Sequence, residues 1–441
     1  MSALSIVVTA ASTPAQTDPA SQKPKINGAT PISLEEAIRL AQRNSPQAIQ
    51  ARGSERTAAA ARRSATGALF PSLSVSAGRV FQLGGAQTRL NQNGEQIAVA
   101  SRPTNSTGLS LNTELFDGGR EFFALRAAKA TQDAAEASSI TTQYNLALDV
   151  KRQYYAVLAA LEAIDAAHAQ SEQAQAQLAS SAAKVRAGVA TRSDSLRGVI
   201  QVGNAQLAEI TAANDLSVAN AALSRLVGSP TPVTADPSSV QEQFSALPDS
   251  AALAAFALQG PAVAQAEANL NAAKQLKKAA KGSYLPSLNM SYSRSGSGVD
   301  NRFGLGNDPF SYNGRLSFSL SYPVFNGWAR EEANVRADVA ETNAEAQLRD
   351  AKMAANQSLA QYLGNLRSAS ARVRVQTASV NAAQEDVRVQ QQRYNIGAST
   401  LLDLLNSQAT LQQAQSALIA ARYDYRIARA QLETLIGRPL P

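Results

Sequence analysis

Cysteine is absent from the 441 residues of this chain. Its absence excludes a disulfide, a thiolate metal centre, a cysteine nucleophile and an acylated N-terminal cysteine, and it suits an oxidising compartment such as the periplasm. Histidine occurs once, as His168. A lone histidine on a long predicted helix is more often a surface or seam residue than a metal ligand or a base. The sequence also lacks a Ser/His/Asp set, a phosphate-binding glycine loop and an HExxH motif, so we expect no enzyme, no cofactor and no metal site.

Long hydrophobic runs are absent as well. No stretch reaches the roughly 18 apolar residues of a transmembrane helix. Aromatic residues make up only 5%, and alanine dominates the 44% of hydrophobic residues, which predicts thin seams between helices instead of one thick core. The 41 basic and 34 acidic residues give a net charge of +7. These charges are scattered along predicted helices without a basic run interleaved with aromatics, so nucleic acid is not an expected partner.

Proline is missing, and glycine nearly missing, from residues 119–187 and 328–396. Each run would form a helix about 100 Å long at about 1.5 Å per residue, which is too long for a compact domain. Apolar residues three and four apart predict left-handed coiled-coil packing in both runs. The first seam comprises Leu146, Val150, Tyr154, Val157, Leu161 and Ile164, and the second comprises Leu359, Tyr362, Leu366, Ala369, Val373, Gln376 and Val380. Shorter helices are predicted at about 192–227 and 401–436.

A twofold internal repeat organises the chain. Gly188-Val-Ala-Thr191-Arg-Ser-Asp194 recurs 209 residues later as Gly397-Ala-Ser-Thr400-Leu-Leu-Asp403, and Leu226-Val-Gly228-Ser-Pro230 recurs at the same offset as Leu435-Ile-Gly437-Arg-Pro439. Because two independent matches at one offset are hard to obtain by chance, each half serves as a template for the other. We divide the chain into a signal-peptide remnant or disordered tail (1–30), a first repeat (31–230), a linker (231–249) and a second repeat (250–441).

Each repeat contains a predicted β-hairpin ahead of its long helix, at residues 70–117 and 284–326. Apolar and small polar residues alternate along four strands of about ten residues, the first two joined by a loop rich in Gly, Gln and Asn; this alternation is typical of transmembrane barrel strands. Aromatic residues near the strand ends would form interface girdles. They are Phe70, Phe81, Phe116, Tyr284, Phe310, Tyr312 and Phe325. Amphipathic hairpins on a soluble core are the alternative, but no block of sequence is left to make such a core.

Four strands are too few to close a membrane barrel, because small barrels begin at about eight strands and an open sheet edge is not tolerated in hydrocarbon. The chain must therefore assemble. Three copies supply 12 strands and two copies only eight. A polar face made mostly of serine suits a wide, wet lumen better than a filled small barrel, so we expect a homotrimer in contact with outer membrane lipid.

This order of elements, over roughly Ile32 to Pro439, resembles the TolC-type outer-membrane efflux proteins (outer membrane factors). The resemblance implies an α+β membrane protein of the bacterial outer membrane, in which a trimeric 12-stranded β-barrel continues into an α-helical periplasmic tunnel. It implies a passive exit duct of a tripartite efflux pump or a type I secretion system. A periplasmic adaptor (membrane fusion) protein would open the periplasmic tip, and an inner-membrane pump of RND or ABC type would drive export.

The turns that end the long helices carry the candidate site. Gly188 and Gly397 are expected as left-handed C-caps and Thr191 and Thr400 as N-caps of the returning helices, with Asp194 and Asp403 as third-position acids of a capping box variant. The resemblance adds that these turns are the periplasmic tips where adaptors dock. The docking residues it implies are Gly188, Thr191, Gly397, Ser399 and Thr400.

Two further roles come from the resemblance. Asp403 matches an acidic residue of the periplasmic constriction, and Asn406 stands where a second acid is frequent. Three carboxylates instead of six would still attract cations at low salt. Asp194 and Tyr394 match two partners of a gating link between tip helices, whereas Ser399 replaces a basic residue.

A second class of function stays open at this point: a periplasmic coiled-coil adaptor or scaffold protein without a pore, with the hairpins as a small β domain. The apolar strand faces bounded by aromatics favour the duct. The cargo cannot be read from the sequence, because pump and adaptor select it.

Overall fold

The structure is a computed structural model that describes residues 29–81, 87–90, 94, 96–99, 103–239, 250–298 and 310–440. The chain forms two compact units. The first comprises Met1–Ala41, Val150–Gln243 and Asp386–Tyr423, and the second comprises Gln42–Asp149, Phe244–Glu385 and Asp424–Pro441. The expected N-terminal tail lies outside the described residues except for its last two positions.

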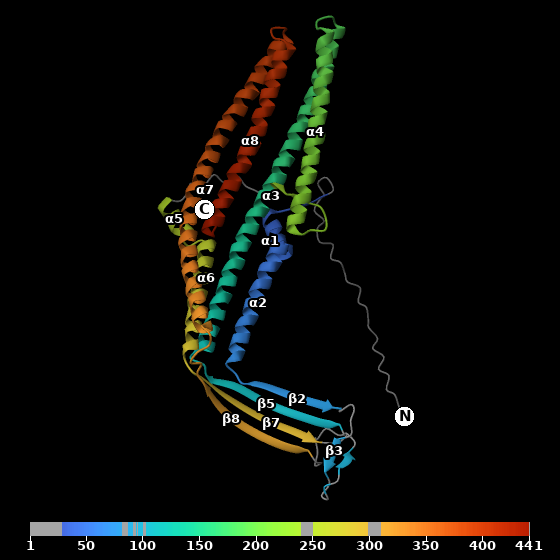
Figure 1. Ribbon diagram of the computed structural model, residues 1–441. Coiled ribbons are helices and arrows are strands. Elements are labelled where there is room, and N and C mark those ends of the chain that lie inside the picture. Colours follow the sequence, from blue (N-terminus) through green and yellow to red (C-terminus); the bar gives the residue numbers. More distant parts are fainter. Residues whose placement is uncertain are drawn as a thin grey trace, which may run out of the picture. The chain divides into compact units, whose positions relative to one another are not determined.

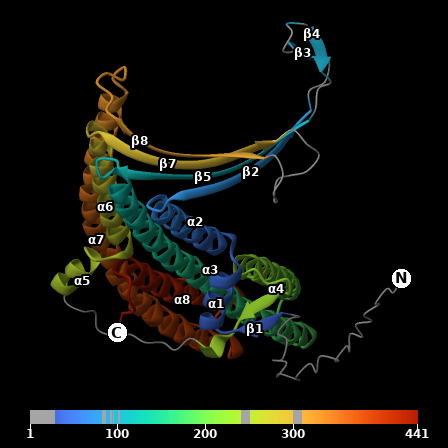
Figure 2. The ribbon, with the colours of Figure 1, turned by 90° about the horizontal axis from the view of Figure 1, so that it is seen from below.

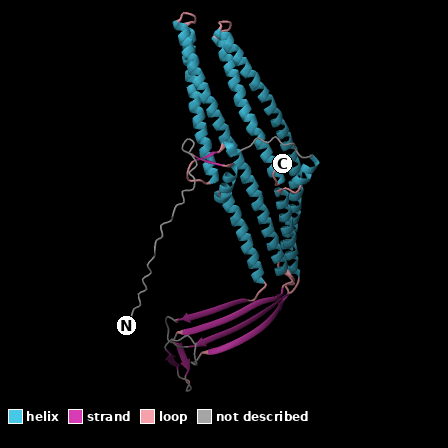
Figure 3. Cartoon of the chain, turned by 180° about the vertical axis from the view of Figure 1, so that it is seen from behind, coloured by secondary structure: helices cyan, strands magenta, loops and turns pink. Residues whose placement is uncertain are grey.

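Long helices make up most of the described chain (Figures 1 and 3). The helices are α1 (Leu34–Asn44), α2 (Pro46–Ala68), α3 (Arg120–Arg186), α4 (Arg192–Val227), α5 (Ser250–Ala257), α6 (Pro261–Lys281), α7 (Ala329–Asn395) and α8 (Leu401–Ile436). Helices α3, α4, α7 and α8 correspond to the four predicted long and returning helices. Each of them begins and ends within one residue of the expected bounds. Among the described helices, none is both long and apolar enough to span a lipid bilayer.

A four-stranded antiparallel sheet belongs to the second unit, with the strand order β2 (Ser72–Val80), β5 (Thr104–Phe116), β7 (Ser287–Gly298), β8 (Ser311–Ser321) (Figure 2). Serines face each other across the ladder: the Oγ atoms of Ser74 and Ser110 are 2.6 Å apart, and those of Ser291 and Ser317 are 2.8 Å apart. Within the described residues β2 and β8 each pair with one strand only, so both sheet edges are open.

The alternate positions of the sheet carry apolar side chains that remain exposed in the single chain. They include Leu73, Val75, Leu316, Phe318 and Leu320. Six of the seven predicted girdle aromatics are also exposed, while Phe310 is half-buried beside Tyr312, with ring centroids 5.7 Å apart. An apolar face of this kind needs a partner other than water.

The loop expected between the first two strands contains a short hairpin, so that prediction was wrong. Strands β3 (Gln87–Leu90) and β4 (Gln96–Val99) pair antiparallel, with Gln87 opposite Val99. Gly94 lies in the turn with a φ of 82°. The Asn-Gly dipeptide at this turn is a strong hairpin signal, and the high Gly and Gln content concealed it.

The core of the second unit joins the C-terminal end of the chain to helices α5 and α7. Its buried residues are Leu253, Ala257, Leu359, Leu366, Ala428, Leu432, Ile436 and Leu440. The Tyr144 hydroxyl donates to the carbonyl oxygen of Gly437 at 2.6 Å, and Gly437 has a φ of 66°. Gly260 approaches the Leu435 carbonyl so closely that a Cβ would lie 2.3 Å from its oxygen. Glycine is therefore required at the start of α6.

Tyr154 of α3 holds the first unit together. The short strands β1 (Thr30–Ile32) and β6 (Val233–Ala235) pair in parallel beside it. The fully buried Tyr154 hydroxyl lies 2.9 Å from the Ile32 carbonyl oxygen and accepts a hydrogen bond from the Asp236 N–H at 3.0 Å. Burial raises the pKa of the Tyr154 phenol, because the charged form would lose its hydration.

We predict that Tyr154→Phe lowers the free energy of unfolding by about 0.5–1.5 kcal/mol, because the hydroxyl's contacts with Ile32 and Asp236 are lost. The Asp236 N–H and the Ile32 carbonyl keep their hydrogen bond to each other at 3.1 Å, so neither group is left without a partner. The midpoint of thermal unfolding, followed by circular dichroism, measures the change. Tyr362→Phe is the matched control, since the Tyr362 hydroxyl makes no hydrogen bond to any described residue. Equal midpoints for the two variants would contradict the role given to Tyr154.

Candidate functional site at the helix tips

Two helical hairpins of the first unit end in turns of the same construction (Figure 1). Gly188 ends α3 with a φ of 75°, and Gly397 ends α7 with a φ of 74°. In each turn the glycine N–H and the N–H that follows it reach back to the helix: Val189 N donates to the Lys184 carbonyl at 3.0 Å, and Ala398 N donates to the Arg393 carbonyl at 2.7 Å. These are Schellman caps, which confirms the two predicted left-handed C-caps.

Each returning helix begins with a reciprocal capping box. The Asp194 carboxylate accepts from the Thr191 N–H at 3.0 Å and from its hydroxyl at 2.8 Å, and the Asp194 N–H donates to the Thr191 hydroxyl at 3.3 Å. Asp403 and Thr400 repeat this pattern at 3.0, 2.7 and 3.2 Å. The hydroxyl and N–H of Thr400 lower the pKa of the Asp403 carboxyl below its ordinary value. The predicted caps are confirmed, and both carboxylates are held in place within their own turn.

Tyr394 is joined to the first hairpin by Lys184. The ammonium nitrogen of Lys184 lies 3.8 Å from the centroid of the Tyr394 ring and 3.5 Å from the Tyr394 carbonyl oxygen. The ring is buried against Leu401 and Leu404. The contact connects α3 to α7 over a sequence separation of 210 residues. Sequence reasoning missed Lys184, since nothing local to it indicates a cation–π partner.

The Asp194 carboxylate and the Tyr394 hydroxyl are not joined in this structure. Asp194 is occupied by Thr191, and the Tyr394 hydroxyl is buried without a hydrogen-bond partner among the described residues. Asp403 and Asn406 are both exposed and stand three residues apart on α8, which places them on one face of the helix. Ser399 is half-buried and donates to the Gln390 carbonyl at 3.5 Å.

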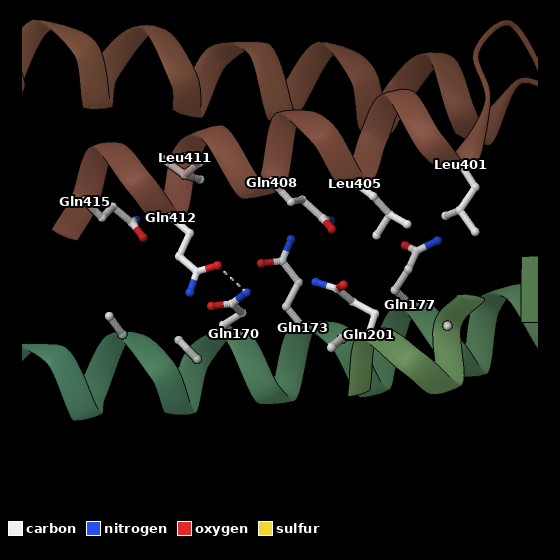
Figure 4. A pocket seen from close by; sticks show the side chains of 14 residues that line it. Gln170, Gln173, Gln177, Gln201, Leu401, Leu405, Gln408, Leu411, Gln412 and Gln415 are labelled. Atoms are coloured by element: carbon white, nitrogen blue, oxygen red, sulfur yellow. Dashed lines mark hydrogen bonds between the residues drawn. The ribbon is translucent and has the colours of Figure 1, made fainter. Parts of the chain in front are cut away.

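A cavity of about 160 Å³ lies between α8 and the α3–α4 hairpin (Figure 4). Glutamine amides from both sides point into it, and no charged residue lines it. The amides are those of Gln170, Gln173, Gln177, Gln201, Gln408, Gln412 and Gln415. Gln170 donates to Gln412 at 2.8 Å across the cavity. Alanines and the side chains of Leu401, Leu405 and Leu411 complete this uncharged lining. Water can replace the contacts between the neutral amides at little cost.

His168 lies on the exposed surface of α3, as predicted. Its Nδ1 is 2.9 Å from a Glu209 carboxylate oxygen on α4, and this contact raises the pKa of the imidazole. A compact acidic group of the described residues, formed by Glu114, Asp117 and Glu121, lies at the start of α3. Asp117 accepts from the N–H groups of Gly119 and Glu121, at 2.9 and 2.6 Å. Asp117 therefore caps the start of α3, while Glu114 pairs with Arg120 at 3.2 Å.

A family model described as "Outer membrane efflux protein" matches residues 37–229 and 254–438. The chain belongs to this family. Protein CyaE of Bordetella pertussis is 28% identical over 407 residues, which cover 91% of this chain and 82% of that protein. Outer membrane efflux protein BepC of Brucella suis is 27% identical over 356 residues, which cover 78% of this chain and 75% of that protein.

Solved outer membrane channels share the fold. The open state of MtrE from Neisseria gonorrhoeae superposes with a TM-score of 0.75 at 21% identity, covering 92% of this chain and 89% of that one. VceC from Vibrio cholerae gives 0.74 at 17% identity, covering 92% and 96%. The predicted TolC-type fold is confirmed, and the family identifies an outer membrane efflux channel that is a transport duct and not an enzyme. The adaptor or scaffold alternative receives no support.

Proposed function

We propose that three copies of this chain form a 12-stranded barrel in the outer membrane, continued by a helical tunnel in the periplasm. The open edges of β2 and β8 support this assembly. In hydrocarbon, unpaired N–H and C=O groups along an edge cost several kcal/mol each, so β8 of one copy must pair with β2 of the next. The sheet thereby supplies its own contact between copies.

An apolar row on α4 supports the same assembly. Leu196, Ile200, Leu207 and Ile210 are spaced four, seven and three residues apart, and all are more than half exposed in the single chain. This spacing is that of a coiled-coil seam without a partner helix. We infer that a helix of a neighbouring copy packs against this row, because a neighbouring copy also pairs the open strand edges in the proposed barrel.

The proposed duct is passive and works with a periplasmic adaptor and an inner-membrane pump of RND or ABC type. One relative, AprF of Pseudomonas aeruginosa, is named as an alkaline protease secretion protein, and another, BepC, as an outer membrane efflux protein. These names support export through a type I secretion system or a tripartite efflux pump. The division into a tail (1–30), two repeats (31–230 and 250–441) and a linker (231–249) is part of the proposal, since each repeat supplies two strands of the sheet and one capped helical hairpin.

The helix tips are the proposed gate. Asp403 and Asn406 form the constriction, and adaptors dock at the turns that contain Gly188, Thr191, Gly397, Ser399 and Thr400. Tyr394 and Asp194 belong to the gating links: Asp194 fixes the turn of the first hairpin, and the Tyr394 ring receives Lys184 from that hairpin. A cation–π contact contributes about 0.5–2 kcal/mol, which a docked adaptor can offset.

Native mass spectrometry and planar-bilayer conductance of the detergent-extracted protein test the central proposal together. We expect a mass of three chains and a small, cation-leaning conductance. A monomer or dimer without conductance would refute the trimeric duct.

We predict that Lys184→Met raises the basal conductance, because the tip of α3 loses its contact with the Tyr394 ring. Lys184→Arg is the control, since a guanidinium also binds an aromatic face, and it should keep the conductance low. The double variant Asp194→Ala with Tyr394→Phe should raise conductance as well, because α4 loses its cap. Tyr394→Phe alone keeps the aromatic ring that Lys184 contacts, so it should leave the conductance unchanged. Unchanged single-channel conductance in Lys184→Met and in the double variant would show that Lys184, Asp194 and Tyr394 do not belong to the gate.

We further predict that Asp403→Asn lowers the cation preference, measured as the reversal potential in a salt gradient. Hydrogen bonds lower the pKa of Asp403 in the folded chain. Its carboxylate therefore stays ionised at all pH values above its ordinary pKa, and it loses its charge only as the pH falls through the lowered pKa. The preference of the unmodified channel should therefore be the same at about pH 7 and about pH 5. A fall in preference between these values would assign selectivity to another group. Asn406→Ala, which changes no charge, is the control.

A further inference from the structure

Trp328 has a left-handed backbone conformation, which residues with a side chain rarely adopt. Among the described residues other than glycine, it alone has a positive φ, of 66°. It directly precedes α7, and its carbonyl oxygen accepts the N–H of Glu332 at 2.9 Å. In this region the Cβ of an L-residue crowds the carbonyl oxygen, so a bulky residue costs free energy that glycine does not.

The first repeat shows that the turn itself does not require tryptophan. Gly118 and Gly119 precede α3 with φ values of 73° and 80°, and Gly327 and Trp328, 209 residues later, have 67° and 66°. The same backbone path is therefore built with glycine at one junction and with tryptophan at the other. A reason for the side chain must lie outside the turn.

Trp328 stands where an apolar surface ends. Its side chain is 68% exposed, and its ring meets the exposed Phe325 edge-to-face with centroids 6.1 Å apart. The exposed apolar residues of one face of β8 and its continuation lead up to this pair: Leu316, Phe318, Leu320, Tyr322 and Val324. Charged residues begin immediately after it, with Arg330, Glu331 and Glu332.

Both junctions carry a phenylalanine at the matched positions Phe116 and Phe325, but they supply their other aromatic side chains from different positions. In the first repeat Phe122 and Phe123 follow the glycine turn, with ring centroids 5.5 Å apart. The positions 209 residues later hold Glu331 and Glu332. The second repeat thus lacks aromatics on the first turn of its helix and carries one in the turn before it. What the repeats share at this junction is the aromatic character.

We propose that Trp328, together with Phe325, inserts into the headgroup region of the lipid bilayer at the boundary between barrel and helices. An indole places an apolar ring against acyl chains and its N–H among headgroups, which offsets the cost of the left-handed backbone. The ligand is a phospholipid surface. That this is the periplasmic leaflet rests on the proposed function, whereas the contact with lipid rests on the strained turn and the apolar row.

Fluorescence tests the proposal directly, because Trp328 is the only tryptophan of the chain. The unmodified protein is reconstituted into phosphatidylcholine vesicles whose acyl chains are brominated either near the carbonyl group or near the chain end. We expect blue-shifted emission, a larger loss of emission with the shallow bromines than with the deep ones, and little loss with aqueous acrylamide.

A matched control moves the tryptophan along the same apolar row. In the double variant Trp328→Phe with Leu320→Trp, the deep bromines should quench more strongly, because Leu320 lies further into the sheet. Quenching of Trp328 by acrylamide but not by bromine would place it in water. Quenching by neither would place it in a protein interface, and either result overturns the proposal. A protein that shows the expected quenching but no conductance would leave the lipid contact intact and refute only the duct.

Discussion

The two open edges of the four-stranded sheet are the constraint on which the rest of this protein depends. An edge exposes a row of unpaired backbone groups, and the faces of β2 and β8 carry exposed apolar side chains. In the proposed membrane barrel these edges lie in a bilayer, where water cannot satisfy their backbone groups. In the proposed assembly, the chain completes these hydrogen bonds by pairing with copies of itself. A second feature also favours a neighbouring copy: α4 carries an exposed apolar row that has no partner in the single chain, formed by Leu196, Ile200, Leu207 and Ile210.

Elements set by local chemistry could be predicted from the sequence. The long helices follow from apolar residues three and four apart and from runs without proline, and their ends follow from glycine at Gly188 and Gly397. The capping boxes at Thr191 and Thr400 were legible because both partners lie within three residues of each other. The short β3–β4 hairpin was missed although its Asn-Gly turn is a local signal, because the surrounding composition resembles a loop.

Contacts between distant segments could not be predicted in the same way. The pairing of β5 with β7 joins two hairpins, and alternation alone does not say which strands become neighbours. Lys184 reaches Tyr394 across a separation of 210 residues, and no local pattern distinguishes it from Lys129 and Lys151, the other lysines of α3. The glutamines of the tip cavity are visible as a composition bias, but their meeting across two hairpins is not. The φ of Trp328 follows from the sequence only through its alignment with Gly119.

The distribution of contact strength at the tips indicates where movement is easiest. Within each turn a Schellman cap and a capping box satisfy the backbone groups and fix Asp194 or Asp403, so the turn moves as one piece. Among the described residues near this cavity, the polar contacts between the hairpins include the cation–π pair and the hydrogen bond that Lys184 makes with Tyr394, and one hydrogen bond between glutamines. Neutral amides exchange partners with water at small cost. Opening of the proposed gate is therefore expected as a displacement of intact hairpins along this seam, without unfolding of the turns next to the proposed constriction.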